Sequence, residues 1–198
     1  MIKRCDWVKE GIHETYHDKE WGVPIHNDRK LFEFLVLDSA QAGLSWAIIL
    51  KRREGYRDAF DNFEPRIISK YTQKKIKELL KNSDIIRNEQ KIKSVINNSK
   101  RFLEVKNEFG TFDKYIWKFV KNKTIIHKHE SWKDIPATSK ESHEMSKDMK
   151  KRGFTYVGPT ICYAFMQTIG MINDHVVDCF RKKQIDQQVR ALAVEKRV

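Results

Sequence analysis

The chain has few of the residues that break helices, with 4 prolines and 8 glycines among 198 residues. Folds built from many short strands need such residues at their turns, so this scarcity favours an all-α fold. No apolar run approaches the roughly 18 residues that a membrane span requires, which argues against a transmembrane helix and a membrane partner. The opening residues MIKRCDWVKE lack the apolar core of a signal peptide, and we therefore expect a cytoplasmic protein.

Cysteines and acidic residues are also scarce. The cysteine count of 3 is odd, which argues against a disulfide framework. Lysine and arginine total 39 against 27 aspartates and glutamates, a net charge of +12. This excess favours a polyanionic partner such as nucleic acid, although a general enrichment in lysine explains part of it. The length predicts one monomeric domain over 1–179, made of two closely packed helical lobes, followed by a basic tail over 180–198 that could form a helix.

Residues 1–26 show no regular pattern but are rich in aromatic side chains. Floppy tails are usually polar and poor in aromatics, so we expect this stretch to pack onto the body of the protein. Its side chains that can bind or ligate are Cys5, Trp7, His13, Tyr16, His17, Trp21 and His26.

A helix is predicted from a cap at Asn27 or Asp28 to about Gln41. Asp38 lies four residues after Phe34, on the apolar stripe of this helix. A carboxylate on an apolar face is unfavourable by several kcal/mol unless it is paired or hydrogen-bonded. Asp38 is therefore either a capping or ion-pairing residue or part of a binding site.

The next helix, over 46–60, follows a short turn at Ala42–Leu44 and a cap at Ser45. The turn brings Asp38 and Trp46 close together, so that a carboxylate and a large ring flank a flexible backbone. Further helices are predicted over 64–71, 72–80, 84–109, 111–120 and 140–152, with a connector over 121–137.

The stretch 150–170 predicts two helices joined by a tight turn. Gly153 suits the end of the first helix, and Gly158-Pro159-Thr160 suits the start of the second. A helix start offers free N–H groups and a positive dipole end to an anion, and a DNA phosphate is the obvious candidate. The predicted backbone contacts are Lys150, Lys151, Arg152, Gly158 and Thr160; the alternative is an ordinary helical corner with solvated lysines.

A metal site is predicted from the spacing of His175 and Cys179. On a helix, residues four apart share one face, and a His/Cys pair suits zinc. Cys5 and His17 are the natural candidates for the other two ligands, and such a closed set would be structural. Alternatively, the four residues are unrelated. Cys162 is expected to be a small buried hydrophobe.

Five segments in order resemble the DNA-3-methyladenine glycosylase I family of base-excision repair enzymes. They span nearly the whole chain: RCDWV at 4–8, YHDKEWGVP at 16–24, LFEFLVLDSAQAGLSW at 31–46, KKRGFTYVGPTICYAFMQ at 150–167 and NDHVVDC at 173–179. The resemblance implies a helix-hairpin-helix glycosylase fold. It also implies one structural zinc ion on Cys5, His17, His175 and Cys179, joining the N- and C-terminal segments.

The resemblance also implies a pocket for a flipped methylated adenine. The family's pocket carboxylate falls on Asp38 and its aromatic rings on Tyr16 and Trp46, with Trp7 and Trp21 nearby. The chain departs from the family in two places, because the family usually has glutamate at the position of Asp38 and tyrosine at that of His13. Aspartate reaches less far by one methylene, and His13 stacks less securely.

The expected activity is flipping and hydrolytic release of 3-methyladenine from alkylated double-stranded DNA, without strand cleavage. Asp38 is interpreted mainly as a recognition group for the cationic base, and Gly43 or Leu44 as a wedge in the gap left by that base. The alternative is a non-enzymatic, zinc-containing DNA-damage-binding protein. A zinc hydrolase is disfavoured because the expected ligand set leaves no open position.

Overall fold

The structure, a computed structural model, describes the backbone of residues 2–195 and the side chains of residues 2–191. It is mostly helical, as predicted. The helices are α1 Ile12–Lys19, α2 Asp28–Gln41, α3 Trp46–Lys51, α4 Arg53–Ala59, α5 Pro65–Ile68, α6 Gln73–Leu79, α7 Glu89–Phe109, α8 Phe112–Trp117, α9 Lys140–Lys151, α10 Pro159–Thr168 and α11 Phe180–Glu195. Short 3-10 turns lie at Asp61–Phe63, Lys118–Val120 and Trp132–Asp134, and two strands at β1 Ile125–Ile126 and β2 Ile172–Asn173. None of the helices in the described part is long and apolar enough to cross a membrane.

Several helices begin directly after a capping residue, whereas Ser45 precedes α3 as predicted but its side chain makes no capping bond within the described part of the chain. The side chains of Asn27 and Ser139 accept hydrogen bonds from backbone N–H groups in the first turns of α2 and α9, confirming both predicted starts. Asn88 caps α7 in the same way, so this helix begins at Glu89 and not at the predicted residue 84.

Four local predictions were wrong. The helix predicted over 46–60 is two helices, because the backbone leaves helical geometry at Arg52 (φ −100°, ψ 3°). The stretch 1–26 is not wholly irregular but contains α1, and the connector 121–137 contains β1 and a 3-10 turn. Residues 174–179 after β2 are not helical, so His175 and Cys179 do not share a helix face.

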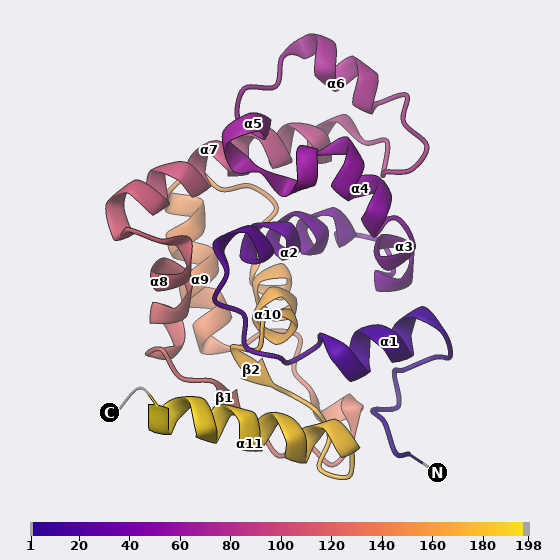
Figure 1. Cartoon of the computed structure of the whole chain (residues 1–198), viewed down its shortest axis with the longest axis vertical. Coiled ribbons are helices and arrows are strands. Elements are labelled where there is room, and N and C mark those ends of the chain that lie inside the picture. The colour runs from indigo at the N-terminus through magenta and orange to yellow at the C-terminus, as the bar shows by residue number, and fades with distance from the viewer. Residues whose placement is uncertain (1, 196–198) are drawn as a thin grey trace.

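The core centres on α2 and α10. Figure 1 shows these two helices in the middle of the molecule, with α3–α7 on one side and α1 and α11 on the other. Every residue of α2 from Leu31 to Ala40 is buried, so this helix is enclosed on all sides. Such enclosure explains why a polar residue on α2 cannot escape to solvent.

The turn between α9 and α10 has the geometry predicted for it. Gly153 has φ +84°, and the N–H groups of Gly153 and Phe154 bond to the carbonyls of Lys150 and Met149. This pair of bonds ends α9 at a left-handed glycine. Pro159 occupies the first turn of α10, as expected.

The C-terminal helix α11 is continuous with the packed body. Ile185 on α11 is fully buried, and Phe180 packs against the hydrophobic core. The predicted helical tail is therefore confirmed up to Glu195, and its first turns belong to the domain core; residues 196–198 lie outside the described part.

The chain before α2 lies tightly against the end of α10. The N–H of Gly22 bonds to the carbonyl of Gln167, and that of Ile25 to the carbonyl of Ile169. Gly170 has φ +73°, and a β-carbon there would lie 2.4 Å from backbone atoms of Val23 and Pro24. Only glycine allows the two backbones to approach so closely.

We predict that Gly170→Ala lowers the free energy of unfolding by about 2–5 kcal/mol, from left-handed strain plus a backbone clash. Gly43→Ala is the matched control, because Gly43 has φ +75° and its added β-carbon would meet no atom of the described residues within 4 Å. In the control, the free energy of unfolding should fall only by the cost of the left-handed strain, about 1–2 kcal/mol. Urea unfolding of both variants measures this, and equal losses would contradict the close-approach argument.

Candidate functional site

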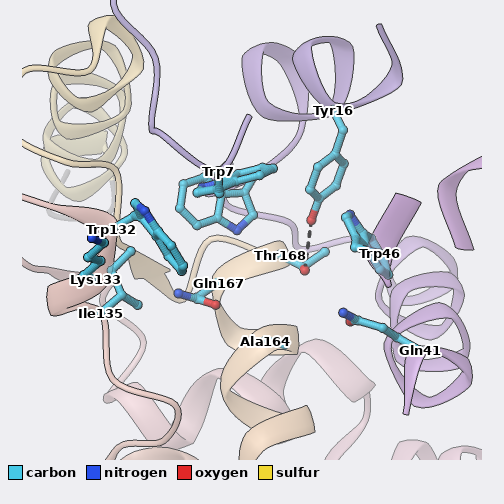
Figure 2. Close-up of a pocket in the computed structure, with 11 residues that line it drawn as sticks. Trp7, Tyr16, Gln41, Trp46, Trp132, Lys133, Ile135, Ala164, Gln167 and Thr168 are labelled. Atoms are coloured by element: carbon cyan, nitrogen blue, oxygen red, sulfur yellow. Dashed lines mark hydrogen bonds between the residues drawn. The ribbon is translucent and has the colours of Figure 1, made fainter. Parts of the chain in front are cut away.

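A cavity of about 530 Å³ lies between the N-terminal segment, the α2–α3 turn, the end of α10 and the 3-10 turn after β1. Figure 2 shows side chains from all four regions pointing toward this space. The residues that line the cavity are Trp7, Tyr16, Trp21, Gln41, Trp46, Trp132, Lys133, Ile135, Ala164, Gln167 and Thr168.

The aromatic rings form a connected wall. The ring centroids of Tyr16 and Trp46 are 5.3 Å apart, and those of Trp7 and Trp21 are 5.1 Å apart in an edge-on arrangement. Trp7 also lies 6.5 Å from Tyr16. The structure thus brings four of the predicted base-binding side chains together around one cavity.

Tyr16 is tied to the floor of the cavity. Its hydroxyl donates a hydrogen bond to Thr168 Oγ1 at 3.0 Å, across 152 residues of sequence. Burial raises the pKa of Tyr16 well above its ordinary value, so the hydroxyl stays protonated. The bond fixes the ring of α1 against α10.

Asp38 is buried, with 1% of its surface exposed, and it lies outside the set of lining residues. Its Oδ2 atom has no hydrogen-bond partner in the part of the chain that the structure describes. Burial raises the pKa of Asp38 well above its ordinary value, against a smaller opposite effect of hydrogen bonding with Thr168. Asp38 makes no ion pair and caps no helix within the described part of the chain, so that interpretation does not hold; the carboxylate neighbours Thr168, which lines the cavity.

His13 is half-buried beside Trp7, with ring centroids 6.0 Å apart. Neither of its ring nitrogens has a hydrogen-bond partner among the described residues. His13 is not one of the residues that line the cavity, so the predicted base contact is not seen for this side chain.

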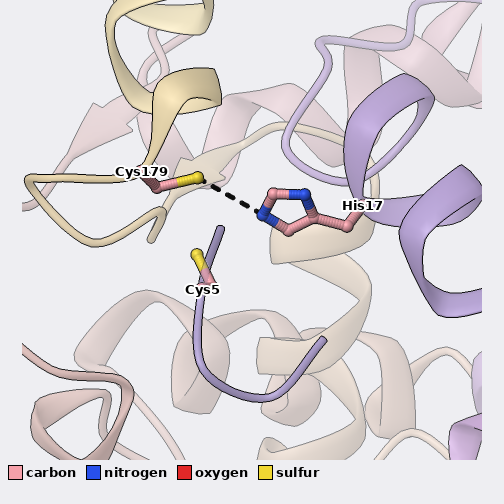
Figure 3. Close-up of side chains that lie close together, drawn as sticks. All are labelled: Cys5, His17 and Cys179. Atoms are coloured by element: carbon pink, nitrogen blue, oxygen red, sulfur yellow. Dashed lines mark hydrogen bonds between the residues drawn. The ribbon is translucent and has the colours of Figure 1, made fainter. Parts of the chain in front are cut away.

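Three of the four predicted metal ligands meet at one point. One ligand atom each from Cys5, His17 and Cys179 lies within 4.8 Å of the others, and all three residues are buried (Figure 3). Cys179 Sγ lies 3.4 Å from His17 Nε2. Hydrogen bonding from the Cys5 thiol, with a further contribution from His17, holds the pKa of Cys179 below its ordinary value. A thiolate in a buried site is the form that binds a soft metal ion.

His175 lies next to this group. Its ring centroid is 4.9 Å from that of His17, and its Nδ1 is 2.8 Å from Asn173 Oδ1. Its Nε2 is buried and has no hydrogen-bond partner among residues 2–191, and burial lowers the pKa of His175 to about 2. A neutral imidazole with an orphaned nitrogen fits a fourth metal ligand, and Asn173 orients the ring as outer-shell residues do.

Two lysines beside the hairpin turn make no ion pair with any described residue. Lys150 and Lys151 are exposed at the end of α9, and Thr160 is exposed in the first turn of α10 after Gly158. Arg152 is engaged elsewhere.

Arg152 donates to both carboxylate oxygens of Glu108 at 2.6 and 3.0 Å and to Asp148 at 2.8 Å. It also lies over the ring of Phe109. The two carboxylates neutralise its charge, so we assign Arg152 to the fold and not to DNA binding.

Sequence reasoning missed several lining residues. Ala164, Gln167 and Thr168 share one face of α10 by their spacing of three and four, a signal that could have been found. Gln41 ends α2. Trp132, Lys133 and Ile135 lie in the stretch treated as a connector, where an isolated tryptophan was the only hint.

The comparisons with known proteins agree on one family. The model of the methyladenine glycosylase family matches residues 7–182. The chain is similar to DNA-3-methyladenine glycosylase of Haemophilus influenzae, with 43% identity over 90% of this chain and 97% of the relative. It is also similar to DNA-3-methyladenine glycosylase 1 of Escherichia coli, with 40% identity over 90% and 96%.

Solved structures give the same result. A crystal structure of 3-methyladenine DNA glycosylase I matches with a TM-score of 0.88 and 42% identity, covering 90% of this chain and 98% of that one. A variant of 3-methyladenine DNA glycosylase I in complex with 3-methyladenine matches with a TM-score of 0.88 and 30% identity, over 90% and 97%.

We predict that Asp38→Asn stabilises the fold increasingly as pH rises. The raised pKa of Asp38 means that its protonated form supports the folded state, fully so below its ordinary value of 3.8, and that this support is lost as pH rises toward the folded-state pKa. The Tm difference between Asp38→Asn and wild type should therefore grow between pH 5 and 8.

Asp58→Asn is the control, because Asp58 is exposed. Its Tm difference from wild type should stay small across the same range. If the Tm difference between Asp38→Asn and wild type also stays constant with pH, the pKa of Asp38 is not raised in the folded protein, and the prediction is wrong.

Proposed function

The chain belongs to the methyladenine glycosylase family, and on that premise we propose that it releases 3-methyladenine from alkylated double-stranded DNA. It is a DNA repair enzyme that hydrolyses N-glycosidic bonds. No lysine is assigned to a covalent step, so the proposed reaction leaves the DNA strand uncut.

One observation carries the proposal: a single cavity of about 530 Å³ walled by tryptophan and tyrosine rings, with a buried carboxylate behind its floor. Its size is that of pockets for small molecules. A DNA-binding protein that only grips the duplex needs no such cavity.

The chemistry follows from the charge of the substrate. Methylation at N3 makes adenine cationic, and the rings of Trp46 and Tyr16 attract a cation at their faces. The base must leave the helix to reach this cavity, at a cost of a few kcal/mol that is smaller for a damaged base. Water then adds to C1′ of the sugar, the bond from C1′ to the base breaks, and its electrons neutralise the departing base while a proton goes to solvent.

Asp38 acts mainly as a recognition group in this proposal. Burial favours the protonated form of Asp38, whereas a nearby cationic base favours the ionised form. Binding of the base therefore promotes ionisation of Asp38, and ionisation strengthens binding of the base. The attraction weakens as the base becomes neutral, so Asp38 accelerates the reaction only through the positive charge that develops on the sugar or through a water it orients. Its short side chain places Thr168, or a water in the cavity, between carboxylate and base.

DNA binding is assigned to the helix-hairpin-helix formed by α9 and α10. The exposed Lys150 and Lys151 and the start of α10 at Gly158 and Thr160 suit a phosphate. Such contacts position the duplex without reading its sequence. The α2–α3 turn at Gly43 and Leu44, beside the cavity residues Gln41 and Trp46, suits a wedge into the gap.

Zinc is assigned to Cys5, His17, His175 and Cys179. Two sulfur and two imidazole donors match a closed structural zinc site. When bound, the ion would supply cross-linking and no catalytic chemistry. Its ligands would fasten the segment that carries Trp7 and Tyr16 to the segment that follows β2.

The test of the activity is release of free 3-methyladenine from methylated DNA, with heat-treated protein as control. Asp38→Asn should slow release by about 10²–10³-fold, the usual effect of removing a charge-stabilising group, with little change in DNA affinity. Asp38→Glu should retain release, since it restores the side-chain length usual in the family. Equal losses of release and DNA affinity in Asp38→Asn would remove the carboxylate from the site. If wild type releases no base, the alternative of a non-enzymatic damage-binding protein holds.

Cys179→Ser should lose zinc and lower the Tm by about 5–10 °C, since a loss of a few kcal/mol shifts Tm by about 2–4 °C per kcal/mol in a domain of this size. Cys162→Ser is the matched control, because Cys162 is also buried but lies outside the ligand group. Elemental analysis and thermal unfolding measure both. Full zinc content in Cys179→Ser would refute the assignment.

A further inference from the structure

A second group of metal-ligating side chains lies outside the four-residue cluster. His127, His129 and Asp174 each offer one ligand atom, and these atoms lie within 4.8 Å of one another. His127 Nδ1 is 2.6 Å and His129 Nε2 is 3.2 Å from the same atom, Asp174 Oδ1. Nothing in the glycosylase reaction uses the two histidines.

The backbone fixes the positions of both histidines. β1 pairs in parallel with β2, so that Ile126 lies opposite Asn173, and the N–H of His127 bonds to the carbonyl of Asn173 at 3.2 Å. The carbonyl of His129 accepts from the N–H of Val177 at 2.9 Å. The two side chains are therefore held beside the carboxylate by main-chain bonds on both sides of Asp174.

Asp174 is oriented from its other oxygen. Its Oδ2 accepts hydrogen bonds from the Tyr163 hydroxyl at 2.6 Å and from Gln167 Nε2 at 2.7 Å. The carboxylate is almost fully buried, and these two bonds leave Oδ1 facing the histidines. Outer-shell bonds of this kind orient the carboxylate ligands of metal ions.

We propose that His127 Nδ1, His129 Nε2 and Asp174 Oδ1 bind a divalent transition-metal ion of the zinc class. Two imidazoles and one carboxylate are a known zinc ligand set, in which water completes the coordination. The histidine side chains are 32% and 15% exposed, which leaves a path for the ion and for water. Each imidazole keeps one proton, on the ring nitrogen that does not bind the metal.

The distances fit such an ion after a small movement. Ligand bonds of about 2.0–2.2 Å in a tetrahedron separate the ligand atoms by about 3.3–3.6 Å. The His129 nitrogen is already near that spacing from Oδ1. The His127 nitrogen, at 2.6 Å, must move away by several tenths of an ångström, and its side chain is the more exposed of the two.

The position of the site gives it a role beside the cavity. The stretch from His129 leads directly to Trp132, Lys133 and Ile135, which form one wall, and the carboxylate that would hold the ion also holds the lining residue Gln167. An ion there would fasten this wall to α10. His127 and His129 act as positioning residues for the wall and touch no reacting atom.

The test is titration of the metal-free full chain with Co²⁺ alone, followed by absorption spectroscopy. Wild type should bind two ions. The ion at the cysteine cluster gives strong sulfur-to-cobalt absorption, and the second ion, with only nitrogen and oxygen ligands, gives weak ligand-field bands. The double variant His127→Gln/His129→Gln should lose the second ion and keep the sulfur-to-cobalt absorption, which also reports that it is folded.

Two further variants sharpen the result. Tyr163→Phe, which removes one hydrogen bond to Asp174 Oδ2, should lower the affinity for the second ion by about 10–100-fold. His26→Gln is the matched control, because His26 is an exposed histidine bonded to a single carboxylate, that of Asp113, at 2.7 Å. It should bind two ions like wild type.

Three outcomes would overturn the proposal: binding of the sulfur-ligated ion alone in wild type, weak ligand-field bands that survive the double variant, or loss of those bands in His26→Gln as well. Titration of Cys179→Ser separates this proposal from the zinc assignment, because the weak bands should persist there without the sulfur absorption.

Discussion

The close contact between residues 20–26 and the end of α10 is the constraint on which both sites depend. Because Gly170 has no side chain, the backbone of Val23 and Pro24 can pack against it. A β-carbon at Gly22 would lie 2.9 Å from the His175 ring. This seam places α1 beside α10, so that Tyr16 reaches Thr168 and His17 reaches Cys179. The base cavity and the cysteine cluster are thus two sides of one junction between the ends of the chain.

The sequence predicted those parts of the molecule that are set by local chemistry. Asn27 and Ser139 marked helix starts because a side-chain acceptor there satisfies free N–H groups, and Gly153 marked an end because it tolerates positive φ. The same reasoning failed at Arg52, where nothing in the residue types announces a break between α3 and α4. It also failed after β2, where backbone pairing with β1, a contact across 47 residues, overrides the helical spacing of His175 and Cys179.

The site was predictable where rings and sulfur atoms stood out, and not where ordinary residues acquire a role from packing. Spacing joined Cys5 and His17 to His175 and Cys179, and the family resemblance added the pocket roles of Tyr16 and Trp46. Thr168 and Gln167 look like any polar residues on a helix; only the arrangement of four separate segments turns them toward the cavity. The engagement of Arg152 by Glu108 and Asp148 likewise depends on tertiary contacts that no local pattern contains.

The ion pairs of Arg152 with Glu108 and Asp148 bear on how the salt concentration would affect DNA binding. Each lysine that neutralises a phosphate releases bound counterions and adds about 0.9 to the slope of log affinity against log salt. In the proposed DNA-binding mode, with Arg152 neutralised by Glu108 and Asp148, the two exposed lysines at the end of α9 would together contribute a slope of about 2. On that proposal the hairpin's own contribution to binding of intact duplex depends little on salt, and longer residence is left to sites where a base enters the cavity.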